Sequence, residues 1–198
     1  MESIESWKTV SITKQLGTPI FRVDNAVRTN PHTGDNGTFV VLDTPQWVNI
    51  IPVTGRGTVV LIRQYRHGTD SITLEIPGGM VEHGEDPCLA AMRECVEETG
   101  FSSPVNAEYL GKVHPNPAFM NNECLMYVWF GCTLTAAPQF DTHEQIEWEE
   151  VPLNALHSLA ADGSITHSLV LTALYYFALK YPHLAALPAQ GANDGHHD

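Results

Sequence analysis

The sequence predicts a mixed α+β fold with a long run of strands, one central helix and two closing helices. Residues 8–65 are rich in β-branched and aromatic residues and are broken by glycine- and proline-containing segments, which is typical of strands joined by turns. Residues 85–100 change to helical periodicity, and a second helical pattern follows residue 152. No internal repeat is visible, so we expect one domain, or one domain with a small accessory unit.

Five strands are expected before residue 66. Their Val, Ile, Thr and aromatic side chains suit the half-buried surface of a sheet. The last break, Gly55-Arg56-Gly57, is short enough for a β-hairpin. The expected strands cover residues 8–14, 19–27, 38–43, 47–54 and 58–65.

The central helix is expected between Asp86 and Gly100. Asp86 suits the N-cap, Pro87 suits the first helical position, and Gly100 suits the left-handed residue just beyond the end. A stripe of apolar side chains is expected to face the core. This stripe consists of Leu89, Met92, Cys95 and Val96.

The C-terminal part continues with strands and ends in helices. The expected strands cover residues 105–113, 123–134 and 146–151, and the expected helices cover residues 153–161 and 165–181. Residues 182–198 lack apolar periodicity, so we expect a disordered tail there. Its adjacent histidines suit a mobile polar tail better than a metal site.

The charge balance is the most informative feature of the composition. Lys and Arg number 10 against 23 Asp and Glu, which gives a formal net charge of −13 at pH 7. Binding to DNA is not expected, because non-specific nucleic-acid binding needs a basic surface. An acidic protein can still bind a phosphorylated substrate when metal ions reverse the local charge of the site. The alternative is that the negative charge serves solubility alone.

The sequence favours a cytoplasmic protein. No apolar run approaches the roughly 20 residues needed to span a bilayer. The N-terminus, MESIESWKTV, has two glutamates and no apolar core, so no signal peptide is expected. The four cysteines show no metal-ligand spacing, and Cys88 and Cys95 are too far apart on one helix for a disulfide. Reduced thiols are therefore expected.

Three acidic residues lie at the C-terminal end of the central helix. Glu94, Glu97 and Glu98 have i, i+3 and i+4 spacing, so their carboxylates are expected to converge. Acidic side chains are disfavoured at this negative end of the helix dipole by roughly 0.3–1 kcal/mol each. A shared cation would relieve this cost and also the repulsion between the carboxylates. Oxygen ligands favour Mg²⁺ or Mn²⁺. A solvated acidic face remains the alternative.

The whole segment resembles the Nudix box. The fixed positions of that pattern are all met across residues 79–101, and Cys95, where an aliphatic residue is usual, is the one mild departure. The matching residues are Gly79, Glu85, Arg93, Glu94, Glu97, Glu98 and Gly100. The resemblance implies a Nudix fold, in which a mixed β-sheet is sandwiched between helices. It also implies Mg²⁺- or Mn²⁺-dependent hydrolysis of a nucleoside diphosphate linked to another moiety.

The resemblance assigns roles within the box. It implies that Glu94 and Glu98 are the principal metal ligands, with Glu97 close by. The carbonyl of Gly78 is implied as a backbone ligand. Arg93 and Glu85 are implied as the pair that orients the cluster.

The proton acceptor for the attacking water is expected outside the helix. In the subfamily that the chain resembles, it commonly comes from a loop after the box, here residues 139–150. Glu144 is the first choice and Asp141 the second. The alternative for either residue is a solvated turn.

Outside the box, residues 45–181 resemble the pyrophosphatases of ADP-ribose and nucleoside diphosphate sugars. The similarity rests on IRQYRHG (62–68), TLEIPGG (73–79) and DGSITHSLVLTALYYF (162–177). Pro117, sixteen residues after Phe101, is a weak further marker of ADP-ribose hydrolases. The alternatives are removal of diphosphate from RNA 5′ ends, hydrolysis of dinucleoside polyphosphates, and a non-catalytic nucleotide sensor.

Several residues outside the box are candidates for substrate contact. Arg66 and Arg63 are candidates for the phosphates, and Glu75 for the metal or the ribose. The loop of residues 114–123 is expected over the site, and an aromatic residue near the N-terminal strands is expected to stack on the base. The remaining candidates are Pro117, Asn122 and Glu123 in the loop, and Trp47, Phe21 and Trp7 for the base. Surface positions, loop structure and core packing are the alternatives.

Three segments are expected. Residues 1–45 form an N-terminal β unit, which in the resembled subfamily often packs across a homodimer. Residues 46–181 form the hydrolase domain, and residues 182–198 form the tail. A homodimer that acts on a small nucleotide sugar is therefore expected.

Overall fold

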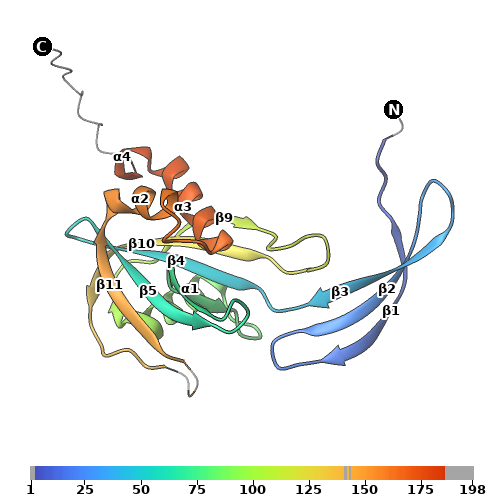
Figure 1. Ribbon diagram of the computed structural model, residues 1–198, viewed down its shortest axis with the longest axis horizontal. Helices are drawn as coiled ribbons and strands as arrows, with labels where there is room; N and C mark the ends of the chain where they lie inside the picture. The colour runs from blue at the N-terminus through green and yellow to red at the C-terminus, as the bar shows by residue number, and fades with distance from the viewer. Residues whose placement is uncertain (1–2, 141, 143, 186–198) are drawn as a thin grey trace, which may run out of the picture.

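The computed structural model describes residues 3–140, 142 and 144–185. In this part the chain forms one three-stranded sheet and one eight-stranded sheet. The larger sheet lies between helices, with α1 on one face and α2 and α3 on the other (Figure 1). The expected mixed sheet sandwiched between helices is confirmed.

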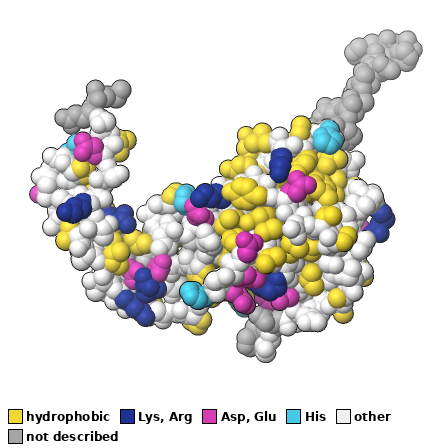
Figure 2. Space-filling model, turned by 180° about the vertical axis from the view of Figure 1, so that it is seen from behind, with side chains coloured by type: hydrophobic (Ala, Val, Ile, Leu, Met, Phe, Trp, Pro, Cys, Tyr) yellow, Lys and Arg dark blue, Asp and Glu magenta, His cyan; other side chains and the backbone are white. Residues whose placement is uncertain are grey.

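The N-terminal sheet projects from the body as a separate lobe (Figures 1 and 2). It consists of β1 (Lys8–Gly17), β2 (Arg22–Thr29) and β3 (Asn36–Asp43), paired antiparallel in that order. The prediction that β2 begins at Pro19 is wrong. Thr18 Oγ1 accepts a hydrogen bond from the Phe21 N–H at 3.0 Å, and this local bond makes residues 18–21 a turn.

The larger sheet has the order β11-β5-β4-β10-β8, with β6 paired to β5, β7 to β4 and β9 to β10. Strands β4 and β10 are parallel, whereas β4 and β5 form the expected hairpin, with Val53 opposite Val59. The strands are β4 (Trp47–Thr54), β5 (Thr58–Arg66), β6 (Ser71–Glu75), β7 (Gly78–Met80), β8 (Phe101–Ser102), β9 (Glu108–Val113), β10 (Cys124–Leu134) and β11 (Ile146–Pro152).

Two cores lie on the two faces of this sheet, because successive side chains of a strand point to opposite faces. On β4, Val48 and Ile50 pack on the side of helix α1 (Pro87–Thr99), while Ile51 and Val53 pack on the opposite side. That opposite side is covered by helices α2 (Leu156–Ala161) and α3 (Ser168–Lys180). A central strand covered on both faces explains the almost continuous apolar run of residues 47–54.

Helix α1 has the predicted ends but a different buried face. Asp86 Oδ1 accepts from the N–H groups of Cys88 and Leu89, and Gly100 has φ +74°. Leu89 is 57% exposed, so the predicted apolar stripe is wrong at this position. The residues that face the sheet are Ala90, Ala91, Cys95, Glu98 and Thr99. Small side chains let the helix lie close to the sheet, and this close packing turns Glu98 inward.

Strand β1 extends to Gly17, beyond its predicted end at residue 14, and β3 begins at Asn36, before its predicted start at residue 38. Three further differences lie in the C-terminal part of the chain. Strand β9 begins at Glu108, because the carbonyl of Val105 accepts a 2.6 Å hydrogen bond from Trp129 Nε1 and lies outside the ladder. Helix α3 begins only after His167, which caps it. The predicted helix over 153–161 is split into a 3-10 turn, η1 (Leu153–Ala155), and α2.

The expectation of disorder from Pro182 is wrong for the first four residues of the tail. Residues Pro182–Ala185 form a short helix, α4, and Leu184 packs against the core. The remaining tail, with its histidine pair, lies outside the described residues. All four cysteines are free thiols, as expected. None of the helices in the described part of the chain is long and apolar enough to cross a membrane.

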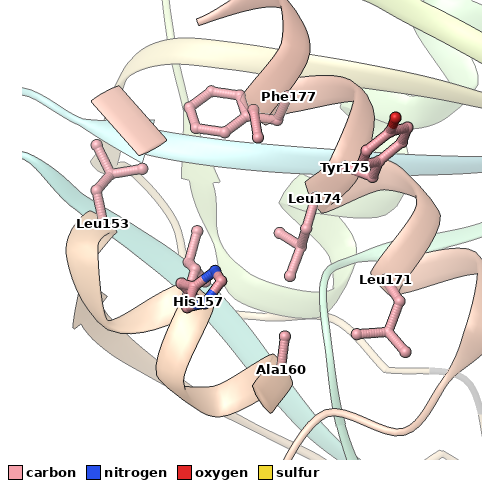
Figure 3. A pocket seen from close by; sticks show the side chains of 9 residues that line it. Leu153, His157, Ala160, Leu171, Leu174, Tyr175 and Phe177 are labelled. Atoms are coloured by element: carbon pink, nitrogen blue, oxygen red, sulfur yellow. The ribbon is translucent and has the colours of Figure 1, made fainter. Parts of the chain in front are cut away.

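An apolar pocket of about 240 Å³ lies between α2 and α3 (Figure 3). Leu153, His157, Leu171, Leu174 and Tyr175 are among its lining residues. None of its lining residues is acidic, and none lines the cavities around Arg66 that are described below. We therefore place the chemistry of the molecule elsewhere.

Gly100, which follows α1, and Gly163, which follows α2, provide a test of how closely the C-terminal end of α1 packs against the rest of the protein. Gly100 and Gly163 both have positive φ, but a Cβ atom on Gly100 would overlap the carbonyl oxygen of Ala136, whereas one on Gly163 would meet open space. We expect Gly163→Ala to lower the free energy of unfolding by about 1–2 kcal/mol through backbone strain alone. Gly100→Ala should cost more, measured by urea denaturation. Equal losses in the two variants would contradict the close packing of α1.

Candidate active site

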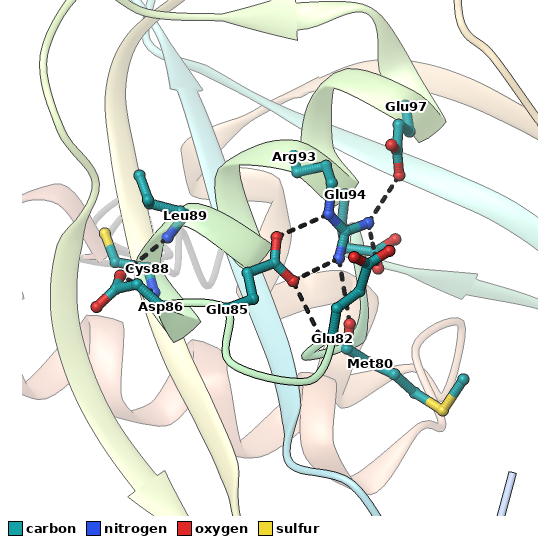
Figure 4. Close-up of polar contacts among 9 residues, drawn as sticks. All are labelled: Met80, Glu82, Glu85, Asp86, Cys88, Leu89, Arg93, Glu94 and Glu97. Carbon is teal, nitrogen blue, oxygen red and sulfur yellow. Dashed lines mark hydrogen bonds and ion pairs between the residues drawn. The ribbon is translucent and has the colours of Figure 1, made fainter.

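Arg93 is the centre of a polar network that joins α1 to the preceding loop and to β7 (Figure 4). Its guanidinium binds both carboxylate oxygens of Glu85, at 2.9 and 3.0 Å. It also donates to Glu94 at 3.0 Å, to Glu97 at 2.9 Å and to the carbonyl of Met80 at 3.2 Å. The expected pairing of Arg93 with Glu85 is therefore present, and Glu97, one turn along the helix, is a further partner. A planar guanidinium bonded on all sides holds the loop, the helix and the strand in one geometry.

Glu98 is a buried carboxylate without an ion-pair partner among the described residues. It is 4% exposed, and the N–H of Gly78 donates to its Oε2 at 2.9 Å. Burial raises the pKa of Glu98 well above its ordinary value, and the charges of Glu94 and Glu144 raise it further. A buried charge is costly without a counter-charge. The position therefore suits a bound cation.

Glu94 lies beside the chain at Gly79. A Cβ atom on Gly79 would overlap the Glu94 carboxylate, and one on Gly78 would overlap the carbonyl oxygen of Val48. The two glycines therefore let β7 pass between β4 and the acidic side of α1. Burial raises the pKa of Glu94 to about 7, although Arg93 opposes this effect.

The three acidic side chains of α1 converge only in part. Glu97 and Glu94 bind Arg93, whereas Glu98 turns toward Gly78. In the described residues, no three acidic, histidine or cysteine side chains form a ready-made metal site. Arg93 Nη1 holds the carboxylates of Glu94 and Glu97 together, and the charge of Glu94 still acts on Glu98. The donors nevertheless fit a hard cation, because Glu98 is buried without a counter-charge and Gly79 leaves room for the Glu94 carboxylate.

Glu144 lies near this acidic site. Its negative charge contributes to the raised pKa values of Glu94 and Glu98 and to that of Arg66. Glu144, one of the two predicted loop acids, is therefore close enough for its charge to act on the acids of α1. The other, Asp141, lies outside the described residues.

Arg66 and Glu75 form a two-pronged ion pair between β5 and β6. Arg66 Nε lies 2.8 Å from Glu75 Oε1, and its terminal nitrogen lies 2.7 Å from Oε2. Thr73 Oγ1 also donates to Oε1, at 2.6 Å. Burial raises the pKa of Glu75, but the hydrogen bonds from Arg66 and Thr73 outweigh burial, and the pKa lies below its usual value. Glu75 is thus a buried anion that fixes the position of Arg66.

A cavity of about 520 Å³ connects these groups to the N-terminal sheet. We call it the main cavity. Gly78, Gly79, Arg66 and Glu75 line it on one side. Most of the other lining side chains are apolar: Ile20, Phe21, Leu42, Trp47, Val48, Met80, Met120 and Leu169. Two of the three aromatic candidates, Trp47 and Phe21, are therefore at the cavity, whereas Trp7 packs edge-on against Phe39 at 5.4 Å.

The other predicted substrate contacts lie outside the main cavity. Arg63 pairs with Glu149 at 2.7 Å across β5 and β11. Glu123 pairs with Lys112 at 2.5 Å, and Pro117 lies exposed in the turn after β9. Asn122 is buried and donates to the carbonyl of Pro45 at 3.1 Å. Met120 is the residue that the 114–123 loop contributes to the main cavity.

Sequence reasoning missed three polar residues of the main cavity, Thr44, Asn49 and His167. Asn49 is a polar residue in an apolar strand, opposite Gly78, which is a signal that the pattern offered. His167 occupies the N-cap of α3, where a histidine side chain accepts the Leu169 N–H at 3.2 Å. The usual N-cap residues are Ser, Thr, Asp and Asn, so His167 was not recognised as a cap. The predicted helix therefore began too early, at residue 165.

The fold is shared with a solved structure. The crystal structure of an ADP compounds hydrolase superposes with a TM-score of 0.80 and 21% sequence identity, over 92% of this chain and 98% of the other.

Three relatives cover about 70% of this chain. The ADP-sugar pyrophosphatase of Mus musculus is 33% identical, over 71% of this chain and 69% of its own length. The ADP-ribose pyrophosphatase of Bacillus subtilis is 27% identical, over 71% and 76% respectively. The methanol dehydrogenase activator of Bacillus methanolicus is 30% identical, over 69% and 74%.

The NUDIX domain model matches residues 44–173, which begin just after the N-terminal sheet and run from β4 into α3. Members of this family generally need a divalent metal ion, in agreement with the buried, unpaired Glu98. The match covers most of the chain, and the chain therefore belongs to the Nudix family.

Proposed function

We propose that the protein hydrolyses the diphosphate of ADP-ribose or of a nucleoside diphosphate sugar to a nucleoside monophosphate and a sugar phosphate. The observation that carries the proposal is the buried Glu98 beside Gly78, at the edge of a cavity that combines an ion-paired Arg66 with apolar walls. The names of the mouse and Bacillus subtilis relatives support this substrate class.

The proposed metal is Mg²⁺ or Mn²⁺, held by Glu94, Glu98 and the carbonyl of Gly78. Such ions neutralise diphosphate oxygens and lower the pKa of a bound water. Arg93 keeps Glu94 and Glu97 in place through the hydrogen bonds described above, and Glu85 fixes Arg93 in turn. The intact set of acids argues against a non-catalytic nucleotide sensor.

Glu144 is the proposed proton acceptor, because it is the described loop acid whose charge reaches both Glu94 and Glu98. It takes one proton from the water as the water oxygen bonds to phosphorus. The anhydride bond of that phosphorus breaks, and the bridging oxygen leaves with the other phosphate. A bound substrate therefore consumes one water and yields two phosphomonoesters.

The main cavity has parts suited to the nucleoside and to the diphosphate. Arg66 has five N–H donors and uses two for Glu75, so it retains donors for phosphate oxygens. Trp47 and Phe21 offer aromatic faces to the base. Arg66 therefore recognises phosphate while Glu75 keeps it oriented.

We further propose a homodimer that acts in the cytoplasm. Strand β1 is exposed along its whole length, and the N-terminal sheet exposes Val10, Ile12, Leu16 and Val40, each by more than half. Exposed apolar patches of this kind mark protein interfaces. The four free thiols support a reducing compartment.

A panel of substrates with Mg²⁺ tests the activity. It contains ADP-ribose, GDP-mannose, UDP-glucose, diadenosine polyphosphates, triphosphorylated RNA and an oxidised dNTP, and the products are identified by chromatography. We expect ADP-ribose or a nucleotide sugar to give the highest kcat/KM, with a nucleoside monophosphate as product. Preference for RNA or for dinucleoside polyphosphates would refute the proposed substrate class.

Replacing single acids of α1 tests the proposed metal site. We expect Glu98→Gln to lower kcat by at least about a hundredfold, since losing even supporting groups of a metal site typically costs 10–100-fold. Glu97→Gln should cost less, because Glu97 is half-exposed and binds Arg93. EDTA should abolish the activity of the wild type, and Mg²⁺ should restore it. Unchanged turnover in Glu98→Gln would show that the metal assignment is wrong.

The proton acceptor is tested by Glu144→Gln, with Glu147→Gln as its control. Glu147 lies nearby on β11, is exposed, and loses the same charge on substitution. We expect Glu144→Gln to lower kcat by about 10²–10⁴ with little change in KM, as for a lost general base. Glu147→Gln should behave like the wild type. If Asp141→Asn rather than Glu144→Gln abolishes turnover, the base is Asp141.

A further inference from the structure

A second cavity, of about 410 Å³, adjoins the main cavity and shares Arg66 and His167 with it. Its size lies in the usual range of small-molecule sites. Four hydroxyl side chains line it: Thr69, Thr73, Thr166 and Ser168. Thr73 Oγ1 donates to Glu75 and Thr69 Oγ1 bonds Ser71, so these two keep mainly acceptor capacity for a ligand, whereas Thr166 and Ser168 lie exposed at the start of α3. We call it the hydroxyl pocket.

The hydroxyl pocket suits a neutral, polyhydroxylated ligand. Hydroxyl groups both donate and accept hydrogen bonds, and so do the hydroxyls of a sugar. The positive charge at the pocket, that of Arg66, is already paired with the buried Glu75. The remaining donors of Arg66 are assigned to the diphosphate in the main cavity, and the hydroxyl side chains beyond it offer neutral partners, which suit a sugar. The lining therefore favours the sugar half of a nucleotide sugar over its phosphates.

His167 stands at the boundary between the two cavities with a defined tautomer. Its Nδ1 accepts the N–H of Leu169 at 3.2 Å, so the neutral ring carries its proton on Nε2. Burial lowers the pKa of His167, although the charge of Glu75 opposes this, and the ring is neutral at pH 7. Nε2 lies 4.0 Å from Glu75 Oε2, beyond hydrogen-bond distance.

Glu75 does not need this donor, because it already accepts two hydrogen bonds from Arg66 and one from Thr73. The side chain of His167 is 31% exposed. The helix cap therefore fixes the Nε2–H group of His167 where the two cavities meet. Glu75, the neighbouring carboxylate, already has its hydrogen bonds from Arg66 and Thr73.

We propose that the hydroxyl pocket holds the sugar of the substrate beyond the diphosphate, and that His167 Nε2–H donates to one of its hydroxyls. This inference rests on the proposed function and deepens it. His167 is then a specificity residue that binds the sugar half of the substrate, outside the acidic site on α1.

Two variants separate the two nitrogens of His167. His167→Asn keeps a cap acceptor near the position of Nδ1 but does not reach the position of Nε2. His167→Gln places an amide nitrogen near the position of Nε2 but loses the short cap acceptor. For the steady-state hydrolysis of ADP-ribose, we expect KM to rise about fivefold or more in His167→Asn, as for one lost neutral hydrogen bond. Its kcat and Tm should stay close to those of the wild type.

His167→Gln should show the opposite behaviour, with a lower Tm and a KM within about twofold of the wild type, since only the cap is lost. ADP, which lacks the second sugar, serves as an inhibitor probe, and its Ki should be unchanged in His167→Asn. A parallel rise in the Ki of ADP would place His167 on the nucleotide half and overturn the sugar assignment.

The failure of this inference differs from failure of the proposed function. Normal hydrolysis of ADP-ribose with an unchanged KM in His167→Asn would reduce His167 to a helix cap and overturn this inference alone. If another nucleotide sugar of the panel is preferred, the same comparison uses that substrate. Hydrolysis of none of the sugar-containing substrates by the wild type would overturn both.

Discussion

The close approach of α1 to β7 is the constraint on which the site depends. It brings the Glu98 carboxylate within 2.9 Å of the Gly78 N–H and the Glu94 carboxylate against Gly79. Ala90 and Ala91 permit the same approach farther along the helix, because both are fully buried against the sheet. A larger side chain at Gly79, Ala90 or Ala91 would push the helix outward, whereas one at Gly78 would collide with β4. The acids would then be solvated, and their affinity for a cation would fall with the rise in local dielectric.

Several acidic side chains are buried or half-buried around the site, and most of them form ion pairs with one of two arginines. Arg93 compensates Glu85, Glu94 and Glu97, and Arg66 compensates Glu75. Glu98 is left with a backbone N–H and with the negative charges of Glu94 and Glu144 nearby. In this network five carboxylates face two arginines, so the ionised acids outnumber the cations that bind them. A divalent ion and a diphosphate together would restore the balance, which explains how a protein of net charge −13 can bind an anionic substrate.

Local sequence patterns predicted most helices and strands, because caps, turns and apolar runs depend on residues that are neighbours in the sequence. Asp86, Pro87 and Gly100 defined α1 correctly, and the apolar runs of β4 and β10 were found because strands buried on both faces need no alternation. The buried face of α1 was not predictable in this way. By hydrophobicity alone, Leu89 is a better candidate than Ala90 for the buried face. Because α1 lies close to the sheet, however, only small side chains fit between them, and this restriction is visible only in the tertiary structure.

The same distinction separates the parts of the candidate site. The box residues were identified because they are close in sequence and belong to a recognised pattern. The residues that join them in space come from three distant segments: Trp47 from β4, Arg66 from β5 and His167 from the start of α3. Arg66 and Trp47 were candidates by type, but nothing local distinguished Arg66 from Arg63, which pairs with Glu149 on the neighbouring strand.

The β-sheet itself makes that distinction. Side chains alternate along β5, and the partner strand at each position decides whether an arginine meets Glu75 or Glu149. Arg66 lies at the end of β5 beyond the last residue paired with β11, where its side chain can reach a cavity. Arg63 lies within the ladder, between two strands that engage it. Strand register, which depends on residues far apart in the sequence, therefore decides which of two similar arginines is available to a phosphate.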